Sequence, residues 1–158
     1  MIQLFNRIKV FLDEQKVEYI VKTHLPTSTS EDSARERGEP LKIGAKALLV
    51  KDNTHFVLVI VPADRRLDTG KLKKILHSQN LRFATAEELK QLTGCEKGAV
   101  PPFGHLLGMG VEMIVDEALF GEEYLAFNAG SLEVSIKMKT ADYKRIIQPK
   151  TGIFSVPG

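Results

Sequence analysis

Lys46 is the residue of this chain best placed to do chemistry, because the residues around it are apolar. It lies in the stretch Ile43-Gly44-Ala45-Lys46-Ala47-Leu48-Leu49-Val50, which has the pattern of a β-strand. Side chains alternate across a strand, so Lys46 shares a face with Leu48 and Val50. An ammonium among such neighbours is costly unless an anion or a carbonyl oxygen meets it. The pattern predicts a site for a negatively charged or carbonyl-bearing ligand. The alternative is an edge-strand lysine whose head group reaches water.

A second candidate is the segment Gly98-Ala99-Val100-Pro101-Pro102-Phe103-Gly104. Glycines at both ends permit backbone conformations denied to other residues, and two consecutive prolines stiffen the middle. A rigid loop of this kind can hold a ligand through its N–H and C=O groups. A purely structural turn is the alternative.

Cysteine and histidine usage excludes several kinds of protein. The single cysteine, Cys95, rules out an internal disulfide and suits a reducing cytoplasm. No zinc-ligand spacing occurs among the four histidines, which are His24, His55, His77 and His105. We therefore expect neither a metal nor another cofactor. The longest apolar run, residues 56–61, is far too short to span a bilayer, so no membrane partner is expected.

Net charge does not identify a partner, because it is only +2. Two local basic clusters can contact phosphates, although solvated surface is the alternative for both. The first cluster is Arg65, Arg66, Lys71, Lys73 and Lys74, and the second is Lys137, Lys139, Lys144 and Arg145.

The elements that must position these residues follow from periodicity and from capping signals. With 158 residues, the chain is expected to form one domain, residues 1–158. We predict helices at about 2–15, 30–38 (capped by Ser30), 69–78 (capped by Asp68), 86–93 (opened by a capping box at Thr85) and 140–147. Strands are predicted at about 18–23, 43–51, 55–62, 81–84, 111–116, 124–127 and 132–138, with a connector over 62–68. Strands in hairpin-like order between helices predict an α+β fold with a mixed, strongly curved sheet.

Several motifs together resemble one known family. They are His24-x-Pro26-Thr27, Lys46 within Gly-Ala-Lys-Ala-Leu-Leu-Val, Arg65-Arg66-Leu-Asp, Thr85-Ala-Glu-Glu-Leu, Gly98-x-x-x-Pro102-Phe103-Gly104, Val115-Asp116-Glu117 and Asn128-Ala129-Gly130-Ser131. Their order and spacing over residues 18–147 resemble the YbaK/prolyl-tRNA-synthetase-associated editing domains.

The resemblance implies a mixed, barrel-like β-sheet flanked by helices and a metal-independent activity. Members of that family hydrolyse the ester that joins a wrong amino acid to the 3′-terminal adenosine of a tRNA, typically tRNA(Pro) carrying a small residue. The implied partners are the 3′ end of aminoacyl-tRNA and a prolyl-tRNA synthetase, with no membrane and no DNA, and the implied location is the cytoplasm. The family's catalytic positions match Lys46, Gly98 and Pro102.

The expected chemistry is simple, because an aminoacyl ester is already activated. The enzyme must position the ester, deliver water and stabilise the oxyanion, and each preorganised donor is typically worth about 3 kcal/mol. The neighbouring ribose hydroxyl can help to activate water, which suits a chain without a convincing nucleophile–histidine–acid triad. Cys95 has no activating neighbour in sequence.

Further substrate contacts are expected from a set of residues outside the lysine. They are His24, Thr27, Ser28, Pro101, Phe103, Asp116, Asn128, Ala129 and Gly130. Asn128 stands where some relatives place a histidine or serine, and it can orient a hydroxyl or water but cannot act as a general base. Asp116 can bind the substrate amine, with capping of a turn as the alternative. A packing or capping role is the alternative for His24, and a turn role for Asn128.

Two other functions remain open at the level of sequence. The first is a non-catalytic module that binds the aminoacylated tRNA 3′ end or a synthetase, and the second is a protein-interaction domain on the same scaffold. A deacylation assay separates hydrolysis from binding.

Overall fold

A computed structural model describes residues 2–27, 29–108 and 110–158 of the chain. Ser28, one of the predicted substrate contacts, lies outside these described residues. The described α-helices are α1 (Ile2–Glu14), α2 (Ser30–Arg37), α3 (Thr69–Leu76), α4 (Ala86–Thr93) and α5 (Thr140–Ile147). The described 3-10 turns are η1 (Leu41–Ile43), η2 (Gly104–Leu106) and η3 (Glu117–Gly121).

Three sheets make up the β-structure of the described residues, where a single curved sheet was predicted. The five-stranded sheet has the order β5 (Arg82–Phe83), β2 (Ala45–Lys51), β3 (Phe56–Pro62), β6 (Glu112–Asp116), β9 (Lys150–Gly152). The three-stranded sheet has the order β1 (Tyr19–Thr23), β8 (Val134–Lys139), β7 (Tyr124–Ser131), and β10 (Ser155–Pro157) pairs with β4 (Arg65–Leu67).

The α+β class and the mixed pairing are confirmed, but the described strands do not close into a barrel. β2 pairs antiparallel with β3 and with β5, whereas β3–β6 and β6–β9 are parallel. The three-stranded sheet is antiparallel throughout. One parallel bridge, between Gly44 and Ala126, joins the start of β2 to β7 and so holds the two larger sheets together.

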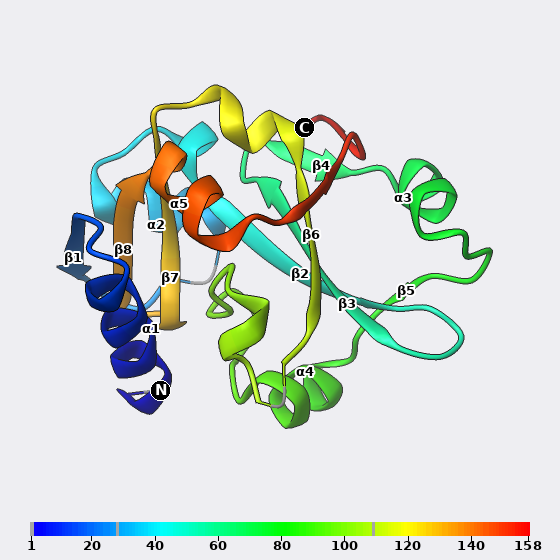
Figure 1. The fold of residues 1–158 in the computed structure, drawn as a ribbon, viewed down its shortest axis with the longest axis horizontal. Helices are drawn as coiled ribbons and strands as arrows, with labels where there is room; N and C mark the ends of the chain where they lie inside the picture. The colour runs from blue at the N-terminus through cyan, green and yellow to red at the C-terminus, as the bar shows by residue number, and fades with distance from the viewer. Residues whose placement is uncertain (1, 28, 109) are drawn as a thin grey trace.

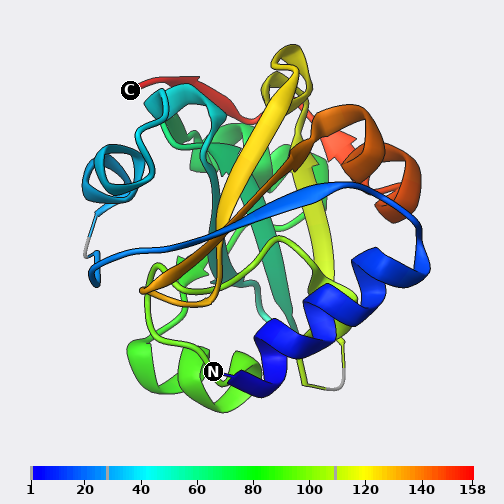
Figure 2. The ribbon, with the colours of Figure 1, turned by 90° about the vertical axis from the view of Figure 1, so that its left-hand side faces the viewer.

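The main hydrophobic core lies between the two larger sheets (Figure 1). Leu58 and Ile60 of β3 face Phe127 of β7 and Ile136 of β8 across it. The predicted apolar stripe of α1 closes one side, with Leu4, Ile8 and Leu12 buried. Figure 2 shows α2 and α5 on opposite sides of β7, so that helices flank the three-stranded sheet.

A second, smaller core covers the opposite face of the five-stranded sheet. It contains Val57, Val59 and Val61 of β3 together with Leu72 of α3 and Phe154. β3 is therefore buried on both faces, as its unbroken apolar sequence predicted.

The predicted caps of α3 and α4 are confirmed. Asp68 accepts a hydrogen bond from the N–H of Lys71, and Thr85 and Glu88 form the complete capping box. α2 is an exception, because the cap is Thr29, whose side chain accepts from the N–H of Asp32, and Ser30 is the first helical residue. Both residue types cap well, so sequence alone does not separate them.

The short strands depart most from the prediction. β4 lies inside the segment predicted as a connector, and β9 and β10 were not predicted. Each contains three residues and pairs with a partner distant in sequence, so no local alternation reveals it. β7 extends to Ser131, beyond the predicted end at 127, through an irregularity in its register with β8.

Candidate active site

A cavity of about 300 Å³ opens between α2, the first half of β2 and the start of the Gly98 loop. Its described lining residues are Thr27, Thr29, Ser30, Ser33, Ala34, Arg37, Leu41, Gly44, Ala45, Lys46, Ala47, Leu48, Ala63, Lys97, Gly98, Val100 and Asn128. Three of them carry positive charge, and none of those described is acidic. The cavity therefore favours a ligand that carries negative charge or develops it.

The sheet itself explains why a cavity forms at this position. β5 pairs with β2 only at Val50 and Lys51, and β7 meets the strand only at the bridge to Gly44, so between these two points the edge of β2 has no paired strand among the described residues. The carbonyl of Leu49 points to that side, where it accepts from the N–H of Ala84 at 2.9 Å. Because antiparallel strands alternate, the N–H and C=O of Ala47 point the same way, toward the cavity. This stretch of strand edge offers main-chain hydrogen bonds to a ligand.

Lys46 is half-buried at this edge, and a main-chain carbonyl oxygen of the protein meets its ammonium. Its Nζ donates to the main-chain oxygen of Arg65 at 2.9 Å. Burial lowers the pKa of Lys46, and the charges of Glu31 and Asp64 oppose that shift. An ammonium has three donors, and within the described residues the Arg65 carbonyl uses one of them, so two remain for a ligand in the cavity.

The predicted loop divides into a part at the cavity and a part in the core. Gly98 lines the cavity at φ +87°, a left-handed conformation that favours glycine. Its carbonyl accepts from Nδ2 of Asn128 at 2.8 Å, which fixes the loop to β7.

The other predicted residues of the loop, Pro101, Pro102 and Phe103, are buried and do not line the cavity. The carbonyl of Pro102 accepts from the buried hydroxyl of Tyr143 at 2.7 Å. The ring of Phe103 packs edge-on against the rings of Phe127 and Tyr143. Pro102 was predicted as a catalytic position, and Pro101 and Phe103 as substrate contacts. Because all three are buried away from the cavity lining, they anchor the loop instead.

A buried polar network lies beneath the cavity and includes a residue that sequence reasoning missed. Arg37 ends α2 and is 9% exposed. Its Nε donates to the hydroxyl of Ser135 at 2.9 Å, and its Nη2 donates to Oδ1 of Asn128 at 3.2 Å. Ser135 also donates to Oδ1 of Asn128 at 3.0 Å. The amide of Asn128 is thereby held in one orientation between Arg37 and the Gly98 loop.

Hydroxyl groups line the part of the cavity next to this network. The hydroxyls of Thr27 and Ser33 lie 2.8 Å apart, and both residues are buried. Thr27 is thus brought to the cavity together with Lys46, Gly98 and Asn128, as predicted.

His24 does not line the cavity, although it reaches the network behind it. Its Nε2 lies 2.6 Å from the Ser135 hydroxyl, and its Nδ1 lies 2.9 Å from the carbonyl oxygen of Leu25. A direct substrate contact was predicted for His24, but its place in the structure gives it contact only through Ser135.

Three further predicted contacts lie away from the cavity. Oδ1 of Asp116 accepts from the N–H of Ala118, and Oδ2 accepts from the N–H of Phe154, so this buried carboxylate caps η3 and holds the chain before β10. The capping alternative therefore describes Asp116. Ala129 is buried in the main core, and Gly130 donates its N–H to the carbonyl of Ala99 at 2.9 Å.

Other chemistry is not evident in the described part of the chain. No group of three or more His, Cys, Asp or Glu side chains there could hold a metal ion. Cys95 is buried, and burial raises the pKa of its thiol, which disfavours a nucleophilic role. None of the described helices is long and apolar enough to span a membrane.

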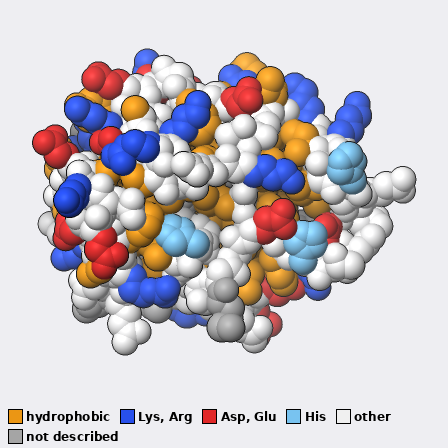
Figure 3. Space-filling view, viewed as in Figure 1, with side chains coloured by type: hydrophobic (Ala, Val, Ile, Leu, Met, Phe, Trp, Pro, Cys, Tyr) orange, Lys and Arg blue, Asp and Glu red, His pale blue; other side chains and the backbone are white. Residues whose placement is uncertain are grey.

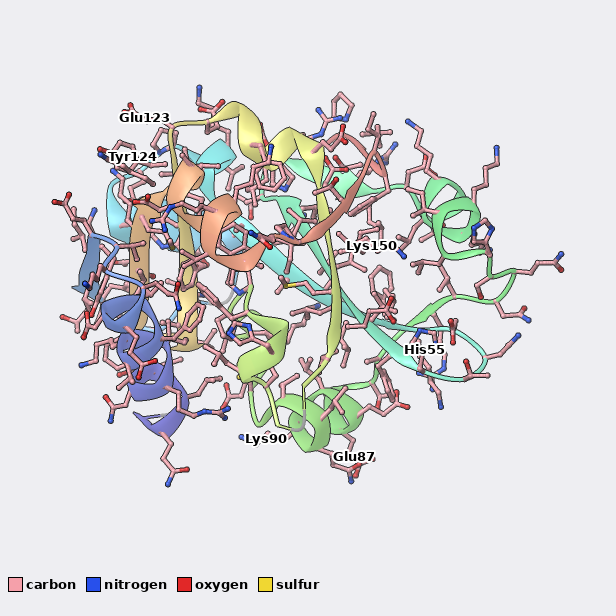
Figure 4. The ribbon with its side chains drawn as sticks, in the orientation of Figure 1. His55, Glu87, Lys90, Glu123, Tyr124 and Lys150 are labelled. Atoms are coloured by element: carbon pink, nitrogen blue, oxygen red, sulfur yellow. The ribbon has the colours of Figure 1, made fainter. Side chains whose placement is uncertain are left out.

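The surface view shows Lys and Arg side chains spread among acidic ones, without one continuous basic patch on that face (Figure 3). The charged residues Glu87 and Lys90 of α4 lie at the lower rim of the molecule and point away from it (Figure 4). At the cavity, by contrast, the charged residues of the described lining are all cationic.

Comparison with known proteins gives consistent matches. The family model described as "Aminoacyl-tRNA editing domain" matches residues 24–146. The chain is 36% identical over 150 residues to the "Multifunctional Ser/Thr-tRNA deacylase ProXp-y" of Escherichia coli (strain K12), covering 92% of this chain and 89% of the relative.

A second relative and a solved structure are also similar to this chain. The chain is 28% identical over 148 residues to the "Prolyl-tRNA editing protein ProX" of Acetoanaerobium sticklandii, covering 90% of each. The crystal structure of the hypothetical protein APE2540 superposes with a TM-score of 0.85 at 22% identity, covering 94% of this chain and 99% of that one. The latter likeness concerns the fold alone.

Proposed function

The chain belongs to the aminoacyl-tRNA editing domain family, and from that premise we propose that it is a trans-acting deacylase of mischarged tRNA. The reaction is hydrolysis of the ester between a wrong, small amino acid and the 3′-terminal adenosine, with tRNA(Pro) as the preferred carrier. The observation that carries the proposal is the cavity that brings Lys46 and Gly98 together with cationic residues and without a described carboxylate.

The charge of the cavity suits this reaction. Attack of water on the ester carbonyl places negative charge on the carbonyl oxygen, and the terminal phosphodiester of the tRNA is anionic from the start. Donors that are already oriented stabilise such charge without reorganisation. Lys46 is oriented by the carbonyl of Arg65, and we assign it to the substrate's phosphate or carbonyl oxygen.

The Gly98 loop and the open edge of β2 are the second part of the proposed site. We assign the main-chain groups of Gly98 and Ala47 to the ribose and the aminoacyl group, because both residues line the cavity. The amide of Asn128 positions Gly98 through its 2.8 Å bond to that residue's carbonyl. Thr27 and Ser33 line the same cavity with hydroxyls, which suits a small or hydroxyl-bearing amino acid.

The names of two relatives state what those proteins act on. One is called a Ser/Thr-tRNA deacylase and the other a prolyl-tRNA editing protein. We propose that this chain acts on a small amino acid esterified to tRNA(Pro) in the cytoplasm. A prolyl-tRNA synthetase is proposed as a further partner that delivers the substrate.

The experiment is a deacylation panel with purified protein. tRNA(Pro) charged with Ala, Ser, Thr, Cys or Pro is incubated with the enzyme, with and without prolyl-tRNA synthetase, and the remaining ester is counted against a protein-free control. We expect at least one mischarged form to lose its ester far faster than the control. If every form decays at the spontaneous rate while binding stays measurable, the protein is the non-catalytic module instead.

A further inference from the structure

Arg37 has a position in the cavity that no motif in the sequence indicated. It is the last residue of α2, and the left-handed Gly38 ends the helix immediately after it. Two of its three guanidinium nitrogens are used by the network, Nε by Ser135 and Nη2 by Asn128. Within the described residues the third nitrogen, Nη1, donates to no protein group. It lies on the Gly44 side, 3.9 Å from where a Cβ on that residue would be, and Gly44 lines the cavity.

Among the residues that the structure describes, no carboxylate contacts Arg37 and neutralises its charge. None of the ion pairs found among the described residues includes it. Glu39 is the acidic group whose charge acts on it, but the carboxylate of Glu39 contacts Lys22 at 3.3 Å and Lys137 at 3.6 Å. Burial lowers the pKa of Arg37, and the charge of Glu39 opposes that shift. A buried, hydrogen-bonded guanidinium that lacks a contacting anion is costly, and a negative ligand group would offset that cost.

The three cationic residues of the cavity differ in depth. Lys97 is exposed, Lys46 is half-buried, and Arg37 is buried. A tRNA 3′ end must enter with its phosphodiester backbone nearer to solvent and its aminoacyl group deeper. The buried guanidinium is therefore placed for the ester, and the exposed ammonium for the phosphate.

We propose that Arg37 is a catalytic residue whose Nη1 donates to the carbonyl oxygen of the scissile ester, an inference that rests on the proposed deacylase function. Nε and Nη2 are held by Ser135 and Asn128, so Nη1 is oriented before the substrate arrives. Lysine at this position would have the charge but not the planar fork that makes three separate bonds.

The step that Arg37 assists balances without any other reactant than water. The oxygen of water bonds to the ester carbonyl carbon, and the carbonyl electron pair moves to the oxygen that faces Nη1. When this tetrahedral intermediate collapses, the bond to the ribose oxygen breaks. The proton lost by water passes to that ribose oxygen, which leaves a free tRNA hydroxyl and the amino acid.

The test compares Arg37→Gln and Arg37→Lys with Arg35→Gln under single-turnover conditions at saturating enzyme. Arg35 is the matched control, because it lies on the same helix, pairs with Asp32 and does not line the cavity. We expect both Arg37 variants to lose about a hundredfold in the rate of the chemical step, with tRNA binding largely retained, and Arg35→Gln to match the wild type. A rate within about threefold of wild type in Arg37→Gln overturns the inference.

Chemical rescue separates catalysis from folding. Arg37→Ala leaves a space beside Gly44 and Asn128, and added guanidinium ion, at concentrations below those that unfold the protein, should restore part of the lost rate. Thermal unfolding of each variant is measured in parallel. Loss of rate that guanidinium does not restore, together with a lowered melting temperature, assigns Arg37 a structural role and overturns the proposal.

The two levels of proposal fail in different ways. If the wild-type protein hydrolyses no mischarged tRNA, the proposed function is wrong and the Arg37 inference falls with it. If the wild type is active and Arg37→Gln is equally active, only the inference about Arg37 is wrong.

Discussion

Replacing Lys46 with methionine removes the ammonium and keeps an unbranched side chain of similar length along β2. The folded protein loses one charge-assisted hydrogen bond, from Nζ to the Arg65 carbonyl at 2.9 Å. Bonds of this kind contribute about 1.5–3 kcal/mol, and relief of the ammonium's desolvation offsets part of the loss. We therefore expect the free energy of unfolding to fall by no more than about 2 kcal/mol.

The effect of the same substitution on catalysis should be larger. Removing one oriented donor from developing negative charge typically costs about 3 kcal/mol, which is roughly a hundredfold in rate. We expect kcat/KM for deacylation of mischarged tRNA(Pro) to fall by about that factor, while the variant stays folded.

Lys51→Met is the matched control for this prediction. Lys51 lies on the same strand, its ammonium packs over the ring of Phe56, and it does not line the cavity. It should keep wild-type activity. Full activity in Lys46→Met, or a loss explained entirely by an unfolded fraction, would refute the role assigned to Lys46.

The remaining predictions concern the loop, its anchor, pH and salt. Gly98→Val should lower the deacylation rate at least tenfold, because φ at this position is +87° and β-branched residues are strained there; unchanged kinetics would remove the loop from the site. Tyr143→Phe should lower stability by about 1–3 kcal/mol, measured by denaturant unfolding, because it leaves the buried carbonyl of Pro102 without its partner; equal stability would show that water or a shift in the loop replaces the bond. Burial lowers the pKa of Lys46, so Lys46 loses its charge at a lower pH than an ordinary lysine does. The enzymatic rate, corrected for spontaneous hydrolysis, should therefore decline with rising pH below the usual lysine range. Lys46→Arg stays charged and should lack this decline, and identical pH profiles of the two proteins would exclude Lys46 as its source. Affinity for tRNA should fall as salt rises, because Lys46, Lys97 and the basic clusters meet phosphates; an affinity independent of salt in a binding titration would leave the clusters as solvated surface.

The residues that sequence could identify are those in conflict with their local surroundings. Lys46 stands out in an apolar strand, and Gly98 precedes a stiff proline pair. The structure places both at the cavity, together with Thr27 and Asn128. The α+β class was predictable from the alternation of apolar and polar residues and from helix-capping residues, because both signals extend over only a few residues.

What sequence missed depends on contacts between distant segments. Arg37 belongs to the polar helix Ser30–Arg37, which resembles a solvated surface helix. Its burial comes from Ser135 and Asn128, which lie 98 and 91 residues further along the chain. Likewise, the acceptor role of the Pro102 carbonyl depends on Tyr143, 41 residues away. No local pattern reports such pairs.

The division of the strands into three sheets has a similar cause. β9 and β10 are three-residue strands that pair with β6 and β4, respectively. Their existence depends on the path of the chain after α5 and not on their composition. The same holds for the short β5, which leaves half of β2 open and so creates the cavity.

Release of the amino acid from mischarged tRNA(Pro) by catalytic amounts of the purified protein tests the proposed activity most directly. With radiolabelled alanine or serine on the tRNA, we predict many turnovers per enzyme molecule, whereas correctly charged prolyl-tRNA(Pro) keeps its ester. Persistence of every mischarged ester at the protein-free rate would contradict the assignment of this cavity as a deacylase site.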